Sequence, residues 1–287
     1  MSLAAVLADA TARLARAGVT SPGVDAEFLL AHVVGVSRGE ILAKVHQGLE
    51  LTEEQTVDLE ALVARREARE PLQHLLGSAP FMSFQVQVGP GVFVPRPETE
   101  SLAERAIQTA STMAVGDGGL RIMDLCSGSG VLAIALARAI PHATVEAVEV
   151  SDDALPYLAQ NVADLAPEVL ITHGSLESFA AGVAPSSLDL IVSNPPYVPD
   201  AETPNEPEVQ NHDPRLALYG GEDGLDVIRI IAEAASRALR PGGVVMLEHS
   251  NLQGAAVREV LESHGFRTVS TEQDLVGRDR FTQGYRP

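Results

Sequence analysis

The segment Arg121–Ile140, "RIMDLCSGSGVLAIALARAI", contains the three parts of one folding unit. Its start, "RIMDLC", is mostly apolar and is typical of a buried strand, and "VLAIALARAI" has the length and composition of a helix. A loop of small residues joins the two. Similar strand-like and helix-like segments alternate from there to the C-terminus. This alternation predicts an α/β fold in which helices cover a mainly parallel sheet.

The other expected elements of this region follow the same pattern. A closing antiparallel pair is expected within residues 266–286, because two alternating runs flank polar turn residues there. The expected strands are residues 121–126, 143–150, 169–174, 188–193 and 242–250, and the expected helices are residues 131–140, 152–165, 224–239 and 252–265. In such a sheet, ligands bind at the carboxyl ends of the strands, near the point where the strand order reverses.

The N-terminal part of the chain has a different character. Residues 1–75 show apolar positions three and four residues apart, which is typical of amphipathic helices. Thr52 and Gln55 have the spacing of a capping box, so a helix is expected to begin there. Residues 81–96 alternate on both sides of Gly89–Gly91 and predict a β-hairpin, and Pro97 begins a further helix. We therefore expect domains at residues 1–78 (helical), 79–100 (hairpin connector) and 101–287 (α/β).

Composition limits the function classes. The 287 residues carry a formal net charge of −19, and no basic cluster interrupts it, so direct binding of nucleic acid is disfavoured. A single cysteine, Cys126, excludes an internal disulfide and fits a reducing cytoplasm. No apolar run approaches the roughly 20 residues of a membrane span, and the N-terminus lacks the features of a signal peptide. The histidines show no metal-ligand spacing, so no metal site is expected.

The loop after the first strand of the α/β region points to a nucleoside cofactor. Its pattern, D-x-C-x-G-x-G, places small residues (Ser127, Gly128, Ser129 and Gly130) before a helix N-terminus, where backbone N–H groups can approach a ligand. Glu149 ends the next strand and can accept hydrogen bonds from both hydroxyls of a ribose. If the position of Cys126 requires a positive φ, its Cβ costs on the order of 1 kcal/mol. We interpret Cys126 as a small buried side chain and not as a nucleophile.

The segment "DLIVSNPPY" ends an apolar strand in a rigid loop, Asn194–Tyr197. Two consecutive prolines restrict the backbone and remove two N–H donors. The side-chain oxygen of Asn194 and the backbone oxygen of Pro195 can then accept both hydrogens of one planar –NH2 group, and the ring of Tyr197 can pack against it. Such a nitrogen is a poor nucleophile that needs positioning more than a base. The loop therefore predicts a binding site for a conjugated –NH2 group, either a base amine or a carboxamide.

Taken together, these motifs resemble a known family along almost the whole chain. "GVTSPGVDAEFLLAHVVGVSR", "QHLLGSAPFMSFQVQVGPGVFVPRPETE", "DLCSGSGVLAIALA", "SNPPYVP" and "GGVVMLEHSNLQ" are similar to the bacterial protein-(glutamine-N5) methyltransferases that modify peptide chain release factors. The resemblance implies a class I methyltransferase (Rossmann-like) fold with a seven-stranded sheet, a small helical substrate-recognition domain and a linking β-hairpin. The segment "PRPETE" distinguishes this family from related enzymes that methylate a large-subunit ribosomal protein.

The resemblance also implies a reaction and a set of site residues. The cofactor would be S-adenosylmethionine, with S-adenosylhomocysteine as the product, and the substrate would be the glutamine of a Gly-Gly-Gln motif in class I release factors. Family members often have an aspartate and an aromatic residue where this chain has Ser175 and Leu176. The implied catalytic residues are Asn194, Pro195 and Tyr197; the cofactor residues are Cys126, Ser127, Gly128, Ser129, Gly130, Glu149, Leu176 and Asn194; the substrate residues are Asn194, Pro195, Pro196 and Tyr197.

Several alternatives remain open at this point. Methylation of a ribosomal protein, adenine-N6 methylation of nucleic acid, and cofactor binding without catalysis would all be compatible with the same two loops. Nothing in the sequence requires an oligomer, so we expect a monomer. We expect it in the cytoplasm. Arg96, Glu98 and Thr99 could border the site or merely begin a helix. Residues 200–221 are expected to be a long irregular loop, ordered by His212, Asp213 and Arg215. His173 and His249 are interpreted as structural histidines.

Overall fold

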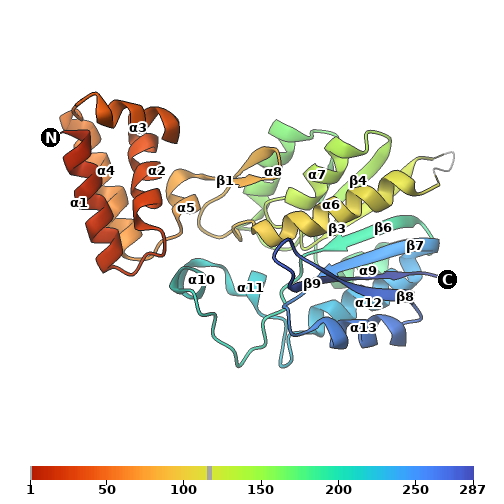
Figure 1. Cartoon of the computed structure of the whole chain (residues 1–287). Coiled ribbons are helices and arrows are strands. Elements are labelled where there is room, and N and C mark those ends of the chain that lie inside the picture. Colours follow the sequence, from red (N-terminus) through yellow and green to blue (C-terminus); the bar gives the residue numbers. More distant parts are fainter. Residues whose placement is uncertain (1, 115–117) are drawn as a thin grey trace. The chain divides into compact units, whose positions relative to one another are not determined.

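The computed structural model describes residues 2–114 and 118–287, and its contacts divide the chain into two compact units (Figure 1). The first unit comprises residues 1–78 and 204–212, and the second comprises residues 79–203 and 213–287. The chain therefore contributes a short segment of its C-terminal half to the first unit. No pattern in the sequence predicts this second entry into the helical unit.

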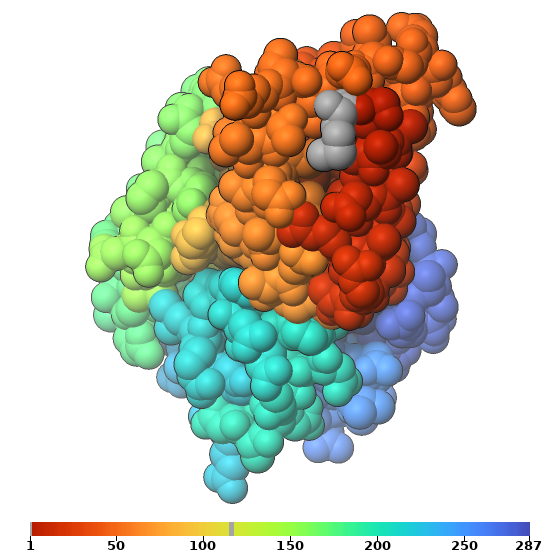
Figure 2. Space-filling model, turned by 90° about the vertical axis from the view of Figure 1, so that its left-hand side faces the viewer, coloured from red at the N-terminus to blue at the C-terminus, as the bar shows by residue number. Residues whose placement is uncertain are grey.

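The first unit is helical, as its periodicity predicted. It contains α1 (Leu3–Arg16), α2 (Pro22–Val34), α3 (Arg38–His46), α4 (Glu53–Glu67), α5 (Leu72–Leu76) and α10 (Pro207–His212). The expected capping box is present at the start of α4, where Thr52 and Gln55 exchange hydrogen bonds of 3.1 Å. Buried leucines of α1, α2 and α4 form the core of the unit. Figure 2 shows the outer surface of these helices in red and orange.

Salt bridges attach α10 to the other helices of this unit. The carboxylate of Glu208 lies 2.7 Å from the guanidinium nitrogens of both Arg66 and Arg69, and Arg66 also binds Asp25 at 2.8 Å. Arg66 is almost fully buried, so its charge needs these partners. Burial by itself would raise the pKa of Glu208, but hydrogen bonds from Arg69 and Arg66 outweigh it and lower that pKa to about 2.

The second unit is built on the predicted seven-stranded sheet. The strand order is β5-β4-β3-β6-β7-β9-β8, and only the contacts of β9 are antiparallel. The strands are β3 (Leu120–Leu125), β4 (Ala143–Glu149), β5 (Leu170–His173), β6 (Leu188–Ser193), β7 (Leu239–Glu248), β8 (Arg267–Gln273) and β9 (Asp279–Tyr285). The order reverses between β3 and β6. The predicted α/β class and the closing antiparallel pair are confirmed.

Helices cover both faces of this sheet (Figure 1). One apolar core joins the sheet to α6 (Pro97–Thr112), α7 (Val131–Ala139) and α8 (Leu155–Leu165). The other joins it to α9 (Leu176–Gly182), α12 (Asp226–Ala238) and α13 (Gly254–Ser263). With both faces buried, the central strands can be almost continuously apolar, as "LDLIVS" is.

Two expectations about local structure were wrong. The hairpin consists of β1 (Ser78–Phe81) and β2 (Phe84–Gln87), so its turn is Met82–Ser83 and not Gly89–Gly91. The later segment packs as an irregular chain, because Gly89 and Gly91 lie so close to α8 that a Cβ would meet Tyr157 and Asp153 at 2.3 and 2.7 Å.

The long loop of residues 200–221 is also more regular than expected. It contains α10 and a further short helix, α11 (Arg215–Leu218). Asp213 and Arg215 help to order it, as predicted. Asp213 is buried and pairs with Arg96 at 2.7 Å, and the guanidinium of Arg215 lies 4.2 Å from the ring centroid of Tyr219.

Candidate active site

The glycine-rich loop links the carboxyl end of β3 to the N-terminus of α7. Cys126, Gly128 and Gly130 all have positive φ angles of 60°, 53° and 86°. A Cβ on Gly130 would lie 2.6 Å from Leu158, whereas one on Gly128 would meet no atom within 4 Å. Gly130 is thus required by close packing, and Gly128 leaves open space beside the loop. The hydroxyls of Ser127 and Ser129 are buried within it.

Two carboxyl groups lie against this loop. Glu149, at the end of β4, accepts hydrogen bonds from the backbone N–H groups of Gly128 (2.7 Å), Val150 (2.9 Å) and Ser151 (2.8 Å). Asp124 accepts one from Ala133 through Oδ2, and its buried Oδ1 has no hydrogen-bond partner among the described residues. Burial, and secondarily the nearby Glu149, raise the pKa of Asp124 to about 7.

These features fit a cationic nucleoside cofactor. The open space at Gly128, the carboxylate at the ribose position and an unpaired buried acceptor occur together at the carboxyl ends of β3 and β4. S-adenosylmethionine carries a sulfonium and an ammonium group, both of which a pair of acidic side chains would favour. The residues of the loop and Glu149 are thus suited to holding this cofactor.

Cys126 has the positive φ that the sequence analysis considered for this position. Its φ of 60° is disfavoured for a residue with a Cβ, at a cost of about 1 kcal/mol. Burial, followed by the negative charge of Glu149, raises the pKa of its thiol to about 12. The thiol therefore stays protonated near neutral pH and is a poor nucleophile.

The NPPY loop follows directly from β6, beside the glycine-rich loop. Because β3 pairs with β6 so that Leu125 faces Ser193, Cys126 and Asn194 begin neighbouring loops at one edge of the sheet. The hydroxyl of Ser193 donates a 2.6 Å hydrogen bond to the backbone oxygen of Leu125 and ties the two strand ends together. The two loops that the sequence singled out are thus brought together at the switch point of the sheet.

The rigid loop leaves two acceptors unused. Within the part of the chain that the structure describes, no hydrogen bond reaches Asn194 Oδ1 or the backbone oxygen of Pro195. The backbone oxygen of Tyr197, by contrast, accepts a 2.9 Å hydrogen bond from Gln253 Nε2. The backbone oxygen of Pro196 is covered by Gly220, where a Cβ would lie 2.5 Å from it. The two oxygens predicted to receive an –NH2 group are thus among the oxygens of this loop that accept no hydrogen bond from the described residues.

Three further side chains surround this loop. Thr99, in the first turn of α6, accepts a 3.3 Å hydrogen bond from Asn194 Nδ2. Glu248, at the end of β7, is 1% exposed, and Thr99 is close enough to its carboxyl group to lower the pKa of Glu248. Arg280 of β9 is near both Glu248 and Tyr197. Burial, and next the charge of Glu248, raise the pKa of the half-buried Tyr197, so its ring is neutral.

These neighbours could be predicted only in part from the sequence. It left open whether Thr99 borders the site, and the structure places Thr99 in contact with Asn194. Glu248 was not identified, although an acid that ends the apolar run "VVML" is unusual enough to have been a signal. Arg96 pairs with Asp213, so it orders the long loop.

Ser175 and Leu176 follow the carboxyl end of β5, next to the end of β4. Ser175 caps α9 by accepting a hydrogen bond from the backbone N–H of Ser178, and Leu176 is partly buried against one of the two cores. Since β5 pairs with β4 so that His173 faces Glu149, this helix begins near the carboxylate expected to bind ribose. The predicted cofactor contact of Leu176 stays a prediction, because the described contacts of its side chain are with this apolar core.

His249 has a structural role, and the described residues contain no metal site. His249 is a satisfied structural histidine, as predicted, because its ring nitrogens bond to Ser250 and Thr282 at 2.8 Å. Among the described residues, no group of three potential ligands could hold a metal ion, and no helix is long and apolar enough to cross a membrane.

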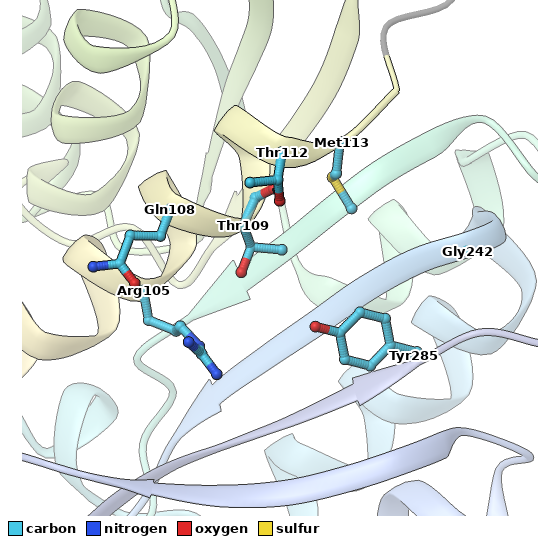
Figure 3. Close-up of a pocket in the computed structure, with 7 residues that line it drawn as sticks. All are labelled: Arg105, Gln108, Thr109, Thr112, Met113, Gly242 and Tyr285. Carbon is cyan, nitrogen blue, oxygen red and sulfur yellow. The ribbon is translucent and has the colours of Figure 1, made fainter.

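A surface hollow near the C-terminal half of α6 is separate from the site (Figure 3). Gly242 and Tyr285 lie beside the amino ends of the parallel strands, since Tyr285 pairs with Val244 early in β7. Asn194 and Glu149, by contrast, lie at the carboxyl ends. The hollow is lined by Arg105, Gln108, Thr109, Thr112, Met113, Gly242 and Tyr285.

The sheet order, the glycine-rich loop with its acidic partner and the NPPY loop define a class I methyltransferase. A solved 16S rRNA N2 G1207 methyltransferase from T. thermophilus, in complex with AdoMet and guanosine, shares the fold with a TM-score of 0.52. It is 21% identical, and the match covers 73% of this chain and 50% of that one. Two families are matched by their sequence patterns: "PrmC N-terminal domain" at residues 5–77 and "Methyltransferase small domain" at residues 105–208.

Full-length relatives identify the family more closely. A release factor glutamine methyltransferase from Streptomyces coelicolor is 46% identical, and the match covers 97% of this chain and 96% of that protein. Proteins of the same name from Corynebacterium glutamicum and Deinococcus radiodurans are 42% and 39% identical, with 98% or more of each chain covered. The chain belongs to the release factor glutamine methyltransferase family, which confirms the resemblance seen in the sequence.

Proposed function

We propose that this protein methylates the side-chain amide nitrogen (N5) of the glutamine in the Gly-Gly-Gln motif of class I release factors, with S-adenosylmethionine as the cofactor. The observation that carries the proposal is the pair of unused acceptors, Asn194 Oδ1 and the Pro195 oxygen. A carboxamide –NH2 has two donors and fits two such oxygens. Family membership indicates that the carboxamide is that of a release factor.

The chain's own residues would act by positioning. Asn194 and Pro195 hold both hydrogens of the amide, and the neutral ring of Tyr197 packs against its plane. S-adenosylmethionine, held by residues 126–130, Glu149 and Leu176, supplies an electrophilic methyl group whose bonding electrons remain on sulfur. Once the new C–N bond forms, the nitrogen becomes acidic and loses one proton to solvent. No strong base is required, and we assign none.

The release factor would be recognised by the helical domain, residues 1–78. The methyl transfer would take place in the methyltransferase domain, residues 101–287, and residues 79–100 would connect the two domains. This assignment rests on the family membership and on the separate apolar core of the helical unit. The proposed enzyme acts as a monomer in the cytoplasm, where its substrate takes part in translation termination.

The test is methyl transfer to an unmodified release factor, read by intact and peptide mass. We expect a gain of one methyl group on the Gly-Gly-Gln glutamine, and a loss of at least about 100-fold in rate with Asn194→Ala, because an acceptor that orients the reacting atom is removed. Release factor with glutamine replaced in that motif is the control. Methylation of a ribosomal protein or of DNA, without methylation of the release factor, would contradict the proposed substrate and keep the –NH2 chemistry.

A further inference from the structure

The side-chain amide of Asn194 has two ends of similar shape: Oδ1 accepts hydrogen bonds and Nδ2 donates them. The proposed reaction needs Oδ1 to face the substrate, because Nδ2 would repel an –NH2 group instead of accepting from it. Rotation of the amide by 180° about its last bond would exchange the two ends. Something in the protein must therefore fix the orientation.

Two buried side chains beside Asn194 can do so. Asn194 Nδ2 donates to Thr99 Oγ1 at 3.3 Å. The Thr99 hydroxyl is in turn close enough to the carboxyl group of Glu248 to lower the pKa of that group. A threonine hydroxyl has one hydrogen to donate. If that hydrogen goes to Glu248, Thr99 presents only lone pairs to Asn194, and only the Nδ2 end of the amide can face it.

The surroundings make Glu248 the fixed end of this chain. Thr99 and Glu248 are 2% and 1% exposed, so water does not compete for their hydrogen bonds. The register of β6 and β7, in which Ser193 faces Leu247, places Asn194 and Glu248 at neighbouring strand ends. Glu248 Oε2 has no hydrogen-bond partner among the described residues. A buried, half-satisfied carboxyl group is costly for stability, which points to a functional reason for keeping it.

We infer that Thr99 and Glu248 are positioning residues, which hold the Asn194 amide with Oδ1 directed toward the substrate –NH2 group. This inference rests on the proposed function and extends it to two residues that do not touch the substrate. Neither residue accepts the transferred methyl group or a proton from the substrate.

The inference also predicts how activity depends on pH. Burial, the strongest influence, raises the pKa of Glu248 to about 7; the hydroxyl of Thr99 and the charges of Arg280 and Arg96 oppose this, and Glu98 adds to it. Tyr197, which also faces Glu248, remains neutral. Above this pKa the carboxylate can only accept and so fixes Thr99. As the pH falls below it, the protonated group can donate to Thr99 and the fixed direction is lost, so kcat should fall.

The first part of the test compares substitutions at position 99. We expect Thr99→Val, which has the same shape without the hydroxyl, to lower kcat roughly ten-fold with little change in cofactor affinity. Thr99→Ser should restore kcat to within about three-fold. Thr109→Val, the same change in the same helix but near the hollow of Figure 3, is the matched control and should leave kcat unchanged. Failure of Thr99→Ser to rescue, or an equal effect of Thr109→Val, would overturn the inference.

The second part uses Glu248→Gln. Its kcat should vary less between pH 6 and 8 than that of the wild type, and the double variant with Thr99→Val should be no slower than Thr99→Val alone, because both changes break one chain of bonds. The inference would be contradicted if the double variant lost kcat by the product of the two single losses, or if Glu248→Gln kept the pH profile of the wild type. If Thr99→Val does not fold, this pH profile decides the question.

A measurement on the protein without substrate separates this inference from the proposed function. The side-chain amide signals of Asn194 in a ¹H–¹⁵N spectrum should shift with pH around 7 in the wild type and not in Glu248→Gln. If the wild type does not methylate release factors, the proposed function fails, and these signals still test the positioning chain. If the wild type does methylate them and neither kcat nor the signals respond, only the positioning chain fails.

Discussion

At the scale of single residues, backbone conformation decides what the cofactor loop tolerates. Gly130 combines a φ of 86° with a neighbouring Leu158 side chain that a Cβ would approach to 2.6 Å. Cys126 shows that the loop accepts one side chain at a positive φ where space allows it. A positive φ and the lack of space for a Cβ are therefore separate reasons for a glycine, and both apply at Gly130.

Gly130→Ala should lower the free energy of unfolding by about 2–4 kcal/mol, since it adds left-handed strain to an overpacked contact. Cofactor affinity should fall with it. Gly182→Ala is the control, because a Cβ there meets no atom within 4 Å; it should change stability by less than about 1 kcal/mol. Urea unfolding of both variants measures this, and equal effects would show that the contact with Leu158 does not matter.

At the scale of elements, α8 holds two segments in place through one side chain. Asn161 is 1% exposed; its Oδ1 accepts from the backbone N–H of Gln87 at 2.6 Å. Its Nδ2 donates to the backbone oxygens of Gln87 (3.0 Å) and Ser129 (2.9 Å). A single asparagine thus joins the end of the hairpin to the cofactor loop, and its loss should affect both.

Asn161→Ala should destabilise the protein by about 2–4 kcal/mol, because it removes three hydrogen bonds and leaves buried backbone groups unpaired. The affinity for S-adenosylmethionine should weaken as Ser129 loses its support. Gln160→Ala, the adjacent and exposed position of α8, should change stability by less than about 0.5 kcal/mol. Thermal unfolding measures the change in stability, and calorimetric titration measures the affinity for S-adenosylmethionine. An Asn161→Ala variant with unchanged stability and unchanged affinity would contradict the role proposed for Asn161.

At the scale of the whole molecule, the chain enters the helical unit twice, first with residues 1–78 and again with residues 204–212. The second entry follows the NPPY loop by only a few residues. Its anchor is Glu208, whose carboxylate binds two arginines of α4 and the turn after it. Because the folded-state pKa of Glu208 is about 2, below its ordinary value of about 4.5, this anchor stabilises the ionised form.

The contribution of Glu208 is fully present above about pH 4.5 and is lost as the pH falls toward 2. Glu208→Gln should remove on the order of 1–3 kcal/mol of local stability at pH 7. Backbone hydrogen exchange in α10 should then be about ten-fold faster or more, and the difference from wild type should shrink between pH 4.5 and 2. Glu222→Gln, at an exposed position, is the control. Unchanged exchange in α10 would show that other contacts hold this segment.

The sequence by itself determined the α/β class, the helical N-terminal part and the two loops of the site. These depend on local physics: apolar periodicity, small residues between a strand and a helix, and two prolines after a buried strand all constrain the chain within about twenty residues. For this reason Asn194, Pro195 and the loop of residues 126–130 could be proposed as site residues from the sequence alone. The turn at Gly89–Gly91 could not, because its glycines serve close packing against α8 and not a hairpin.

Only the tertiary structure decided which residues support the site from a distance. Thr99 and Asn194 are 95 positions apart, and Glu208 reaches arginines about 140 positions away. Strand register and helix packing bring these groups together, and a single sequence carries no local record of such contacts. The chemistry proposed for this protein could therefore be predicted from its loops, whereas the proposed orientation of the Asn194 amide depends on buried partners that only the folded sheet places beside it.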